Sequence, residues 1–90
     1  MSCKVKLYKS VKKFLKKISK DLAKRINKRL SELSKNPMCE EKLKGNLRDL
    51  CKSRVGSYRI AYLLKSCTII VVDIDHGGRF YDKLRHLLKC

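Results

Sequence analysis

The chain has 90 residues, a length that predicts one domain with a small core. Lys and Arg total 24 against 8 Asp and Glu, which gives a formal net charge of +16. This excess favours a polyanionic partner such as RNA, DNA, a ribosome, an anionic membrane or an acidic protein. It does not choose among these partners.

The chain shows neither a secretory signal nor an apolar run long enough to cross a membrane. Its five cysteines include no Cys-x-x-Cys pair and no Cys-His cluster with zinc spacing. We therefore expect a cytoplasmic protein whose thiols are reduced, with Cys51 and Cys67 as small residues of predicted strands. No phosphate-binding loop, dinucleotide fingerprint or Ser-His-Asp set appears, so no cofactor is expected.

The N-terminal part predicts one strand followed by helix. Residues 3–9 alternate polar with apolar side chains, which indicates a half-buried strand. Ser10 is the predicted N-cap of a first helix and Ser19 that of a second, which ends at Asn36-Pro37. The pattern fits either a helical hairpin or one kinked helix.

The predicted outer face of these helices is strongly basic. It is either an ordinary solvated face or a surface that rests on RNA phosphates. A basic amphipathic helix can also lie on a membrane, but here the apolar stripe is needed to cover the sheet. The cations are Lys12, Lys13, Lys16, Lys17, Lys20, Lys24, Arg25, Lys28, Arg29 and Lys35, opposed by Asp21 and Glu32.

Residues 50–64 predict a β-hairpin with the two-residue connection Gly56-Ser57, which is typical of a type II′ turn. This turn fixes the register and sets Arg54 opposite Arg59. Because side chains alternate along a strand, Lys52, Arg54 and Arg59 then share one face. Two arginines directly opposite each other repel, so a bound anion is one explanation of the arrangement and a solvated basic surface is the other. We expect the cationic face to be open, with Arg59 largely exposed.

The remaining elements complete an α+β domain. Residues 38–49 resemble a linker, and Lys65-Ser66 predict a turn. Residues 67–75 are β-prone and apolar on both faces, which predicts a central strand. Residues 79–89 show the pattern of a short helix. The predicted order is β-α-α-β-β-β-α, with a largely antiparallel sheet covered on one face by the two N-terminal helices.

Three segments together resemble the RelE/ParE toxin superfamily of toxin–antitoxin systems. They are Leu43-Lys44-Gly45, the hairpin from Lys52 to Tyr62, and Asp75-His76-Gly77-Gly78-Arg79-Phe80-Tyr81. The order of elements agrees as well, so the resemblance covers the whole chain and implies a single RelE-like toxin domain over residues 1–90. The hairpin carries most of its specificity.

The resemblance implies a catalytic site. RelE-type toxins are similar to small ribonucleases that cut messenger RNA in the ribosomal A site through attack by the RNA 2′-OH. Arg59 matches the central hairpin arginine of the family, Lys52 and Arg54 match its basic positions before the turn, and Tyr81 matches its terminal tyrosine. Gly77 stands where the family usually has an arginine, and Arg79 is the expected substitute.

The resemblance also implies partners. We expect a RelB-like antitoxin, the ribosome and messenger RNA, but no membrane and no small-molecule cofactor. Three functions fit the sequence: a ribosome-dependent endoribonuclease, a ParE-like inhibitor of DNA gyrase, and an RNA- or ribosome-binding module without full catalysis. The cationic cluster with Tyr81 favours the first function, while Gly77 leaves the other two open.

Overall fold

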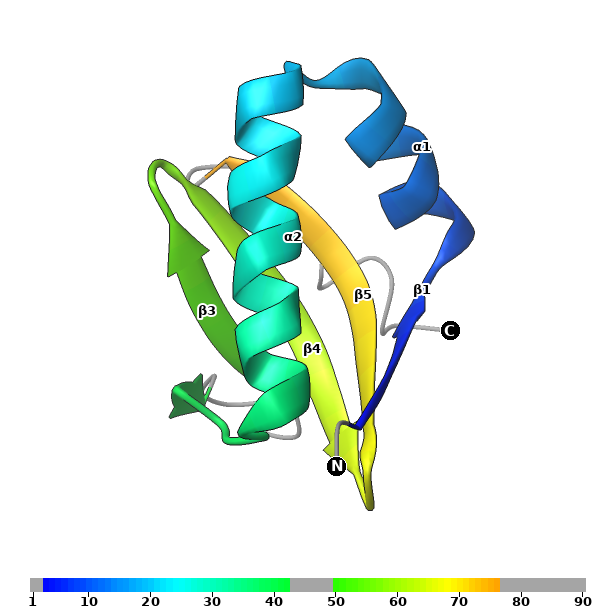
Figure 1. The fold of residues 1–90 in the computed structure, drawn as a ribbon, viewed down its shortest axis with the longest axis vertical. Helices are drawn as coiled ribbons and strands as arrows, with labels where there is room; N and C mark the ends of the chain where they lie inside the picture. The colour runs from blue at the N-terminus through cyan, green and yellow to red at the C-terminus, as the bar shows by residue number, and fades with distance from the viewer. Residues whose placement is uncertain (1–2, 43–49, 77–90) are drawn as a thin grey trace.

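The computed structural model describes residues 3–42 and 50–76. Over these residues the chain forms two helices and a five-stranded sheet (Figure 1). The predicted helix over residues 79–89 lies outside the described part. In chain order the elements are β1 (Lys4–Leu7), α1 (Lys9–Lys17), α2 (Lys20–Lys35), β2 (Glu41–Lys42), β3 (Cys51–Val55), β4 (Tyr58–Lys65) and β5 (Thr68–His76).

The sheet has the strand order β1-β5-β4-β3-β2. Strand β1 runs parallel to β5, and the other neighbours are antiparallel, which confirms the α+β class and the largely antiparallel sheet. As its apolar character on both faces predicts, β5 lies inside the sheet between β1 and β4. The short strand β2 differs from the prediction, which treated its residues as linker.

The helices are two separate elements, as one of the two sequence interpretations holds. Ser19 caps α2, and its hydroxyl accepts a hydrogen bond from the Leu22 amide at 3.2 Å. The prediction of Ser10 as the cap of α1 is wrong. The carbonyl of Tyr8 already accepts the amides of residues 11 and 12, so Tyr8 is the N-cap and Ser10 lies within the helix.

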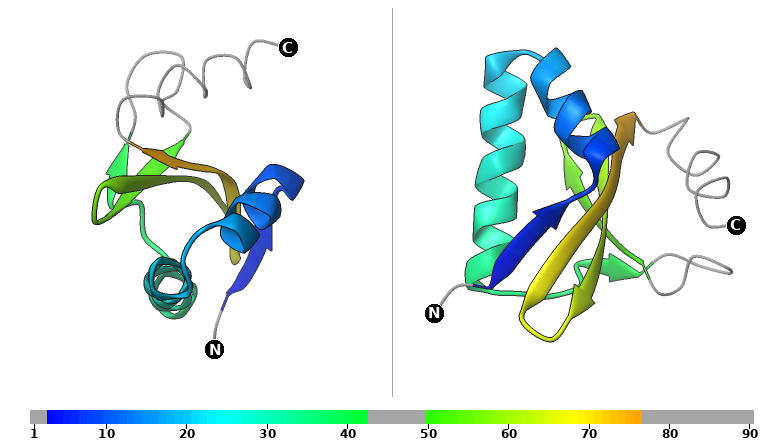
Figure 2. Two further views of the ribbon diagram at one scale, coloured as in Figure 1. Left: turned by 90° about the horizontal axis from the view of Figure 1, so that it is seen from above. Right: turned by 90° about the vertical axis from the view of Figure 1, so that its right-hand side faces the viewer.

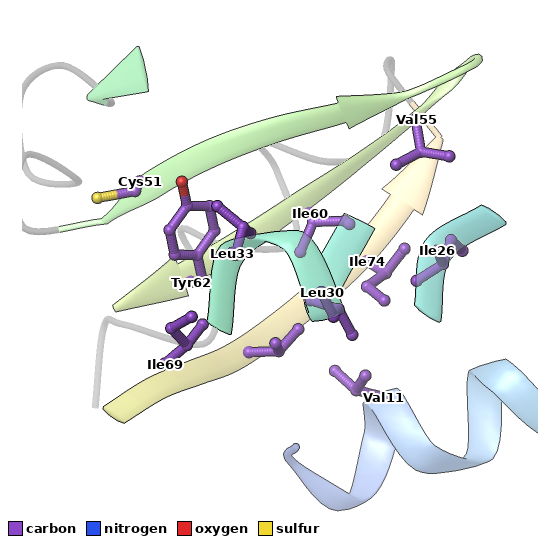
Figure 3. Packing of buried hydrophobic residues seen from close by; sticks show 11 residues of the cluster. Val11, Ile26, Leu30, Leu33, Cys51, Val55, Ile60, Tyr62, Ile69 and Ile74 are labelled. Carbon is purple, nitrogen blue, oxygen red and sulfur yellow. The ribbon is translucent and has the colours of Figure 1, made fainter. Parts of the chain in front are cut away.

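Both helices cover the same face of the sheet, as Figure 2 shows from two further directions. Helix α2 supplies Ile26, Leu30 and Leu33 to the core, and α1 supplies Val11. In Figure 3 these side chains pack against residues of β3, β4 and β5. The core therefore fixes one face of the hairpin, while the other face carries the cations beside a second buried cluster of Leu50, Ala61 and Val72. The strand residues of this core are Cys51, Val55, Ile60, Tyr62, Ile69, Val71 and Ile74.

The β3–β4 hairpin has the predicted register. Val55 pairs with Tyr58, and Arg54 pairs with Arg59. Gly56 has φ +59°, while Ser57 is absent from the residues with positive φ, which is the combination that a type II′ turn requires.

A β-bulge interrupts the pairing of β4 with β5. Ala61 pairs with Asp73 while Tyr62 pairs with Val71, so Val72 is the extra residue. A shift of one residue moves side chains to the other face of a sheet. The bulge thereby places Asp73 and Asp75 on the cationic face, across from Ala61 and Arg59 respectively.

The expectation of reduced thiols is wrong for the four described cysteines. Cys3 is bonded to Cys67 with a Cα–Cα distance of 4.7 Å, and Cys39 is bonded to Cys51 with 5.3 Å. Both distances suit a disulfide. Cys67 also lies in the exposed β4–β5 turn rather than in a strand. The partners are 64 and 12 residues apart in sequence, and only the fold brings them together.

Candidate functional site

The structure brings Lys52, Arg54 and Arg59 together on the sheet face that the helices leave uncovered. Their neighbours Cys51, Val55 and Ile60 belong to the helix-facing core, so alternation turns the three cations the other way. This confirms the shared face that the turn register predicts. It gives two neighbouring strands a common cationic surface, which we call the cationic face.

The three cations differ in exposure, and the prediction that Arg59 is largely exposed is wrong. Arg54 is exposed, Arg59 is half-buried, and Lys52 is only 7 % exposed. The Nε of Arg59 is buried without a hydrogen-bond partner. A buried N–H without a partner is costly. The Nε–H of Arg59 is therefore a donor that gains from a hydrogen bond to a ligand on this face.

Carboxylates flank the cations on both sides of the hairpin. Glu41 of β2 pairs with Lys52 in the sheet, and its Oε1 lies 3.2 Å from the Lys52 Nζ. Asp75 of β5 pairs with Arg59, and the buried Asp73 lies one row further along. Two cross-strand rows result, Glu41–Lys52–Ala61–Asp73 and Arg54–Arg59–Asp75. The cationic face therefore combines three cations with carboxylates that lie beside them.

A hydrogen-bond network on the helix-facing side of the hairpin holds residues 38–40 in place. The Glu40 carboxylate accepts hydrogen bonds from Arg29 at 3.0 Å and from the Ser53 hydroxyl at 3.0 Å. The Tyr62 hydroxyl donates to the Met38 carbonyl at 2.9 Å and accepts from the Glu40 amide at 3.1 Å. Burial raises the pKa of Tyr62, so this hydroxyl stays protonated at neutral pH and remains a donor.

His76 lies at the end of β5, opposite Tyr58 and so away from the cationic face. It is exposed, and its ring meets the ring of Tyr58 edge-on at a centroid distance of 4.9 Å. Its amide donates to the Asp75 carboxylate at 2.7 Å. These contacts agree with a structural role for the imidazole.

The other candidate residues fall outside the described parts of the chain. Arg79, Tyr81 and Gly77 belong to the last segment, and Leu43-Lys44-Gly45 precede the hairpin. Within residues 3–42 and 50–76, no group of three or more His, Cys, Asp and Glu side chains is suited to hold a metal ion. Neither helix of the described part is long and apolar enough to span a bilayer.

Comparison with known proteins decides the family. A model of the ParE toxin of type II toxin–antitoxin systems matches residues 5–81, a span that includes all of β1 except Lys4, every later element of the described fold, and the segment with Arg79 and Tyr81. The chain belongs to the RelE/ParE toxin superfamily. It is thus a toxin of the type II toxin–antitoxin class, as the hairpin residues indicate. No match was found among curated protein sequences.

Solved structures of RelE are similar to this RelE/ParE toxin. An archaeal RelE from Pyrococcus horikoshii, solved with RelB, is 30 % identical with a TM-score of 0.69, covering 88 % of this chain and 99 % of that one. RelE from Methanococcus jannaschii, also solved with RelB, is 26 % identical with a TM-score of 0.66 and coverages of 87 % and 96 %. A mutant E. coli RelE in the free state shares the fold, with 20 % identity, a TM-score of 0.77 and coverages of 98 % and 100 %.

The sequence interpretation missed the acidic residues of this toxin's candidate site. Glu41 falls in the predicted linker, and Asp73 and Asp75 fall in the predicted central strand, with no site role assigned to any of the three. The two-residue Ser66-Cys67 turn, followed without interruption, sets Asp73 opposite Ile60 and hence on the helix-facing side. The bulge at Val72 reverses that assignment, and no local sequence pattern predicts the bulge.

Proposed function

We propose that the protein is a ribosome-dependent endoribonuclease that cleaves messenger RNA in the A site. The observation that supports this most directly is the common face of Lys52, Arg54 and Arg59 on a paired hairpin. Guanidinium groups bind phosphate oxygens in a planar, bidentate manner, and a lysine adds a point charge. A rigid hairpin carrying these cations suits a phosphate whose charge increases in the transition state.

In the proposed reaction the RNA 2′-oxygen attacks the adjacent phosphorus and the 5′-oxygen leaves. The products are a 2′,3′-cyclic phosphate and a 5′-hydroxyl. Arg59 contacts the scissile phosphate, with Lys52 and Arg54 in support. Tyr81 exchanges a proton with the reacting oxygens, or stacks on a base, and Arg79 takes the place of the arginine that Gly77 replaces.

A cleavage assay on programmed ribosomes tests this function, with RNA 5′ ends mapped as the readout. Arg59→Ala removes one stabilising contact and is expected to lower the cleavage rate roughly 10²–10³-fold. Lys28→Ala removes an exposed cation from α2 and is the matched control, with little expected effect. Cleavage by Arg59→Ala at the wild-type rate contradicts the proposed role.

Inhibition of DNA gyrase is the second candidate function, because the family model that matches residues 5–81 is that of ParE. A supercoiling assay alongside the ribosome assay separates the two. A protein that blocks supercoiling and leaves messenger RNA intact on ribosomes replaces the first proposal with the second.

The proposed partner is a RelB-like antitoxin, since two relatives at 26 % and 30 % identity were solved as complexes with RelB. The charge of +16 suits an acidic, partly disordered partner that folds on binding. Co-purification from cells carrying the native locus tests this. Action on ribosomes or gyrase implies a cytoplasmic location. Disulfides are rare in that compartment, except in intracellular proteins of hyperthermophiles.

A further inference from the structure

The ion pair between Glu41 and Lys52 is unequal in its exposure. The side chain of Lys52 is 8 % exposed, whereas that of Glu41 is 63 % exposed. The carboxylate is thus the partner that faces solvent. A buried ammonium group must stay paired, so an anion that arrives from solvent and makes further contacts on the protein can replace the carboxylate only by taking over its place beside Lys52.

The backbone of Glu41 is held much more firmly than its side chain. Cys39 is bonded to Cys51, the residue before Lys52. Glu40 is fixed by Arg29, Ser53 and Tyr62. A strand of two residues such as β2 is short for pairing alone to hold, and these neighbours secure it. These contacts keep the Glu41 carboxylate within reach of Lys52.

We infer that Glu41 is a specificity-determining residue that occupies the phosphate-binding position of Lys52 and is displaced by a polynucleotide. The assignment of Lys52 to phosphate binding rests on the proposed function. A small anion gains only the ammonium group and does not displace the carboxylate efficiently. A polynucleotide phosphate also meets Arg54 and Arg59 on the same face, so Glu41 selects against simple anions.

The test measures binding of an all-2′-deoxy oligonucleotide of about ten nucleotides, a length within the range that single-strand binding sites cover. Lacking a 2′-OH, this probe is not cut by the proposed reaction. Glu41→Gln keeps the side-chain shape and removes the charge. Two unit charges about 4 Å apart in water interact enough to change an equilibrium roughly fivefold, so we expect about fivefold tighter binding by fluorescence anisotropy.

Glu32→Gln is the matched control. Glu32 is 62 % exposed and pairs with Arg29 on α2 at 3.6 Å, so its replacement changes the net charge equally and leaves Lys52 untouched. We expect less than about a twofold change for it, since salt screens charges that lie far from the bound strand. Equal tightening by both variants overturns the inference, because it reduces the effect to net charge.

A double-mutant cycle shows whether the effect passes through Lys52. In a Lys52→Met background, Glu41→Gln is expected to tighten binding much less than in the wild type. An undiminished gain, a neutral or weakening effect of Glu41→Gln, or a wild-type protein that does not bind the probe overturns the inference. Messenger RNA cleavage is assayed separately, so its absence alone refutes the proposed function and not the competition at Lys52.

Discussion

The guanidinium group of Arg25, on α2, lies directly over Gly56 at the tip of the β3–β4 hairpin. A Cβ placed on Gly56 meets Arg25 Nη2 at 3.4 Å and Nη1 at 3.6 Å. These are ordinary contacts with the end of a flexible side chain. Glycine is therefore required at this position by its φ of +59°. The contact between Arg25 of α2 and the turn would by itself leave room for a larger residue.

Gly56→Ala is expected to lower the free energy of unfolding by about 1–2 kcal/mol, because an L-residue with a Cβ is strained at positive φ. Urea denaturation measures this. The loss is expected to persist in an Arg25→Ala background, since the strain lies in the backbone. If removing Arg25 abolishes the cost, the contact and not φ controls the turn.

In the β4–β5 turn, a change to glycine is expected to raise the free energy of unfolding. Ser66 has φ +53° and occupies the position that corresponds to Gly56 in the first hairpin. Ser66→Gly relieves backbone strain and loosens the unfolded chain, and we expect a net gain of about 0–1 kcal/mol in unfolding free energy. Ser57→Gly, at a position of negative φ, is the matched control and is expected to destabilise. A clear loss on Ser66→Gly contradicts the assignment of strain.

The two disulfides are expected to differ in their contribution to stability. In the chain-entropy model, the Cys3–Cys67 bond across 64 residues contributes about 4 kcal/mol and the Cys39–Cys51 bond across 12 residues about 3 kcal/mol. Thermal unfolding of the paired serine variants, Cys3→Ser/Cys67→Ser and Cys39→Ser/Cys51→Ser, measures the difference. The reverse order points to native-state contacts around Cys39 as the larger contribution.

Tyr62→Phe is expected to cost about 1–2 kcal/mol at neutral pH, because it leaves the Met38 carbonyl and the Glu40 amide without their partner. Burial raises the folded-state pKa of Tyr62. Its contribution is therefore complete below the unfolded pKa of about 10 and falls as pH rises beyond that value. The deficit of Tyr62→Phe should therefore shrink in urea denaturation as the pH rises above about 10 and through the raised folded-state pKa. A deficit that is constant over this range refutes the coupling.

Local patterns predicted the parts of the fold that short-range rules govern. The Gly56-Ser57 turn gave the register of β3 and β4 and with it the shared face of three cations. Ser19 marked the start of α2, and the apolar run of β5 marked it as an inner strand. The prediction for the N-cap of α1 was wrong. Serine is a residue type that favours the N-cap position, but Tyr8 occupies that position in α1.

The acidic side of the candidate site was beyond prediction for a physical reason. It depends on a bulge at Val72, on a two-residue strand at Glu41–Lys42, and on a disulfide from Cys39. Each of these is decided by tertiary contacts, not by the spacing of nearby residues. The cations were accessible to sequence reasoning because a turn fixes them locally, whereas their counter-charges arrive from other strands.

The parallel pairing of β1 with β5 sets the order in which a nascent chain acquires structure. Strand β1 is made first, yet its only sheet neighbour in the described part of the chain begins at Thr68. Strand β4 likewise has a paired strand on each side only after β5 has formed. Such long-range pairing is slow, and it cannot start before residues 68–76 have left the ribosome. A nascent chain that stops short of Thr68 lacks the strand that joins β1 to β4, so the five-stranded sheet cannot form until residues 68–76 have been made.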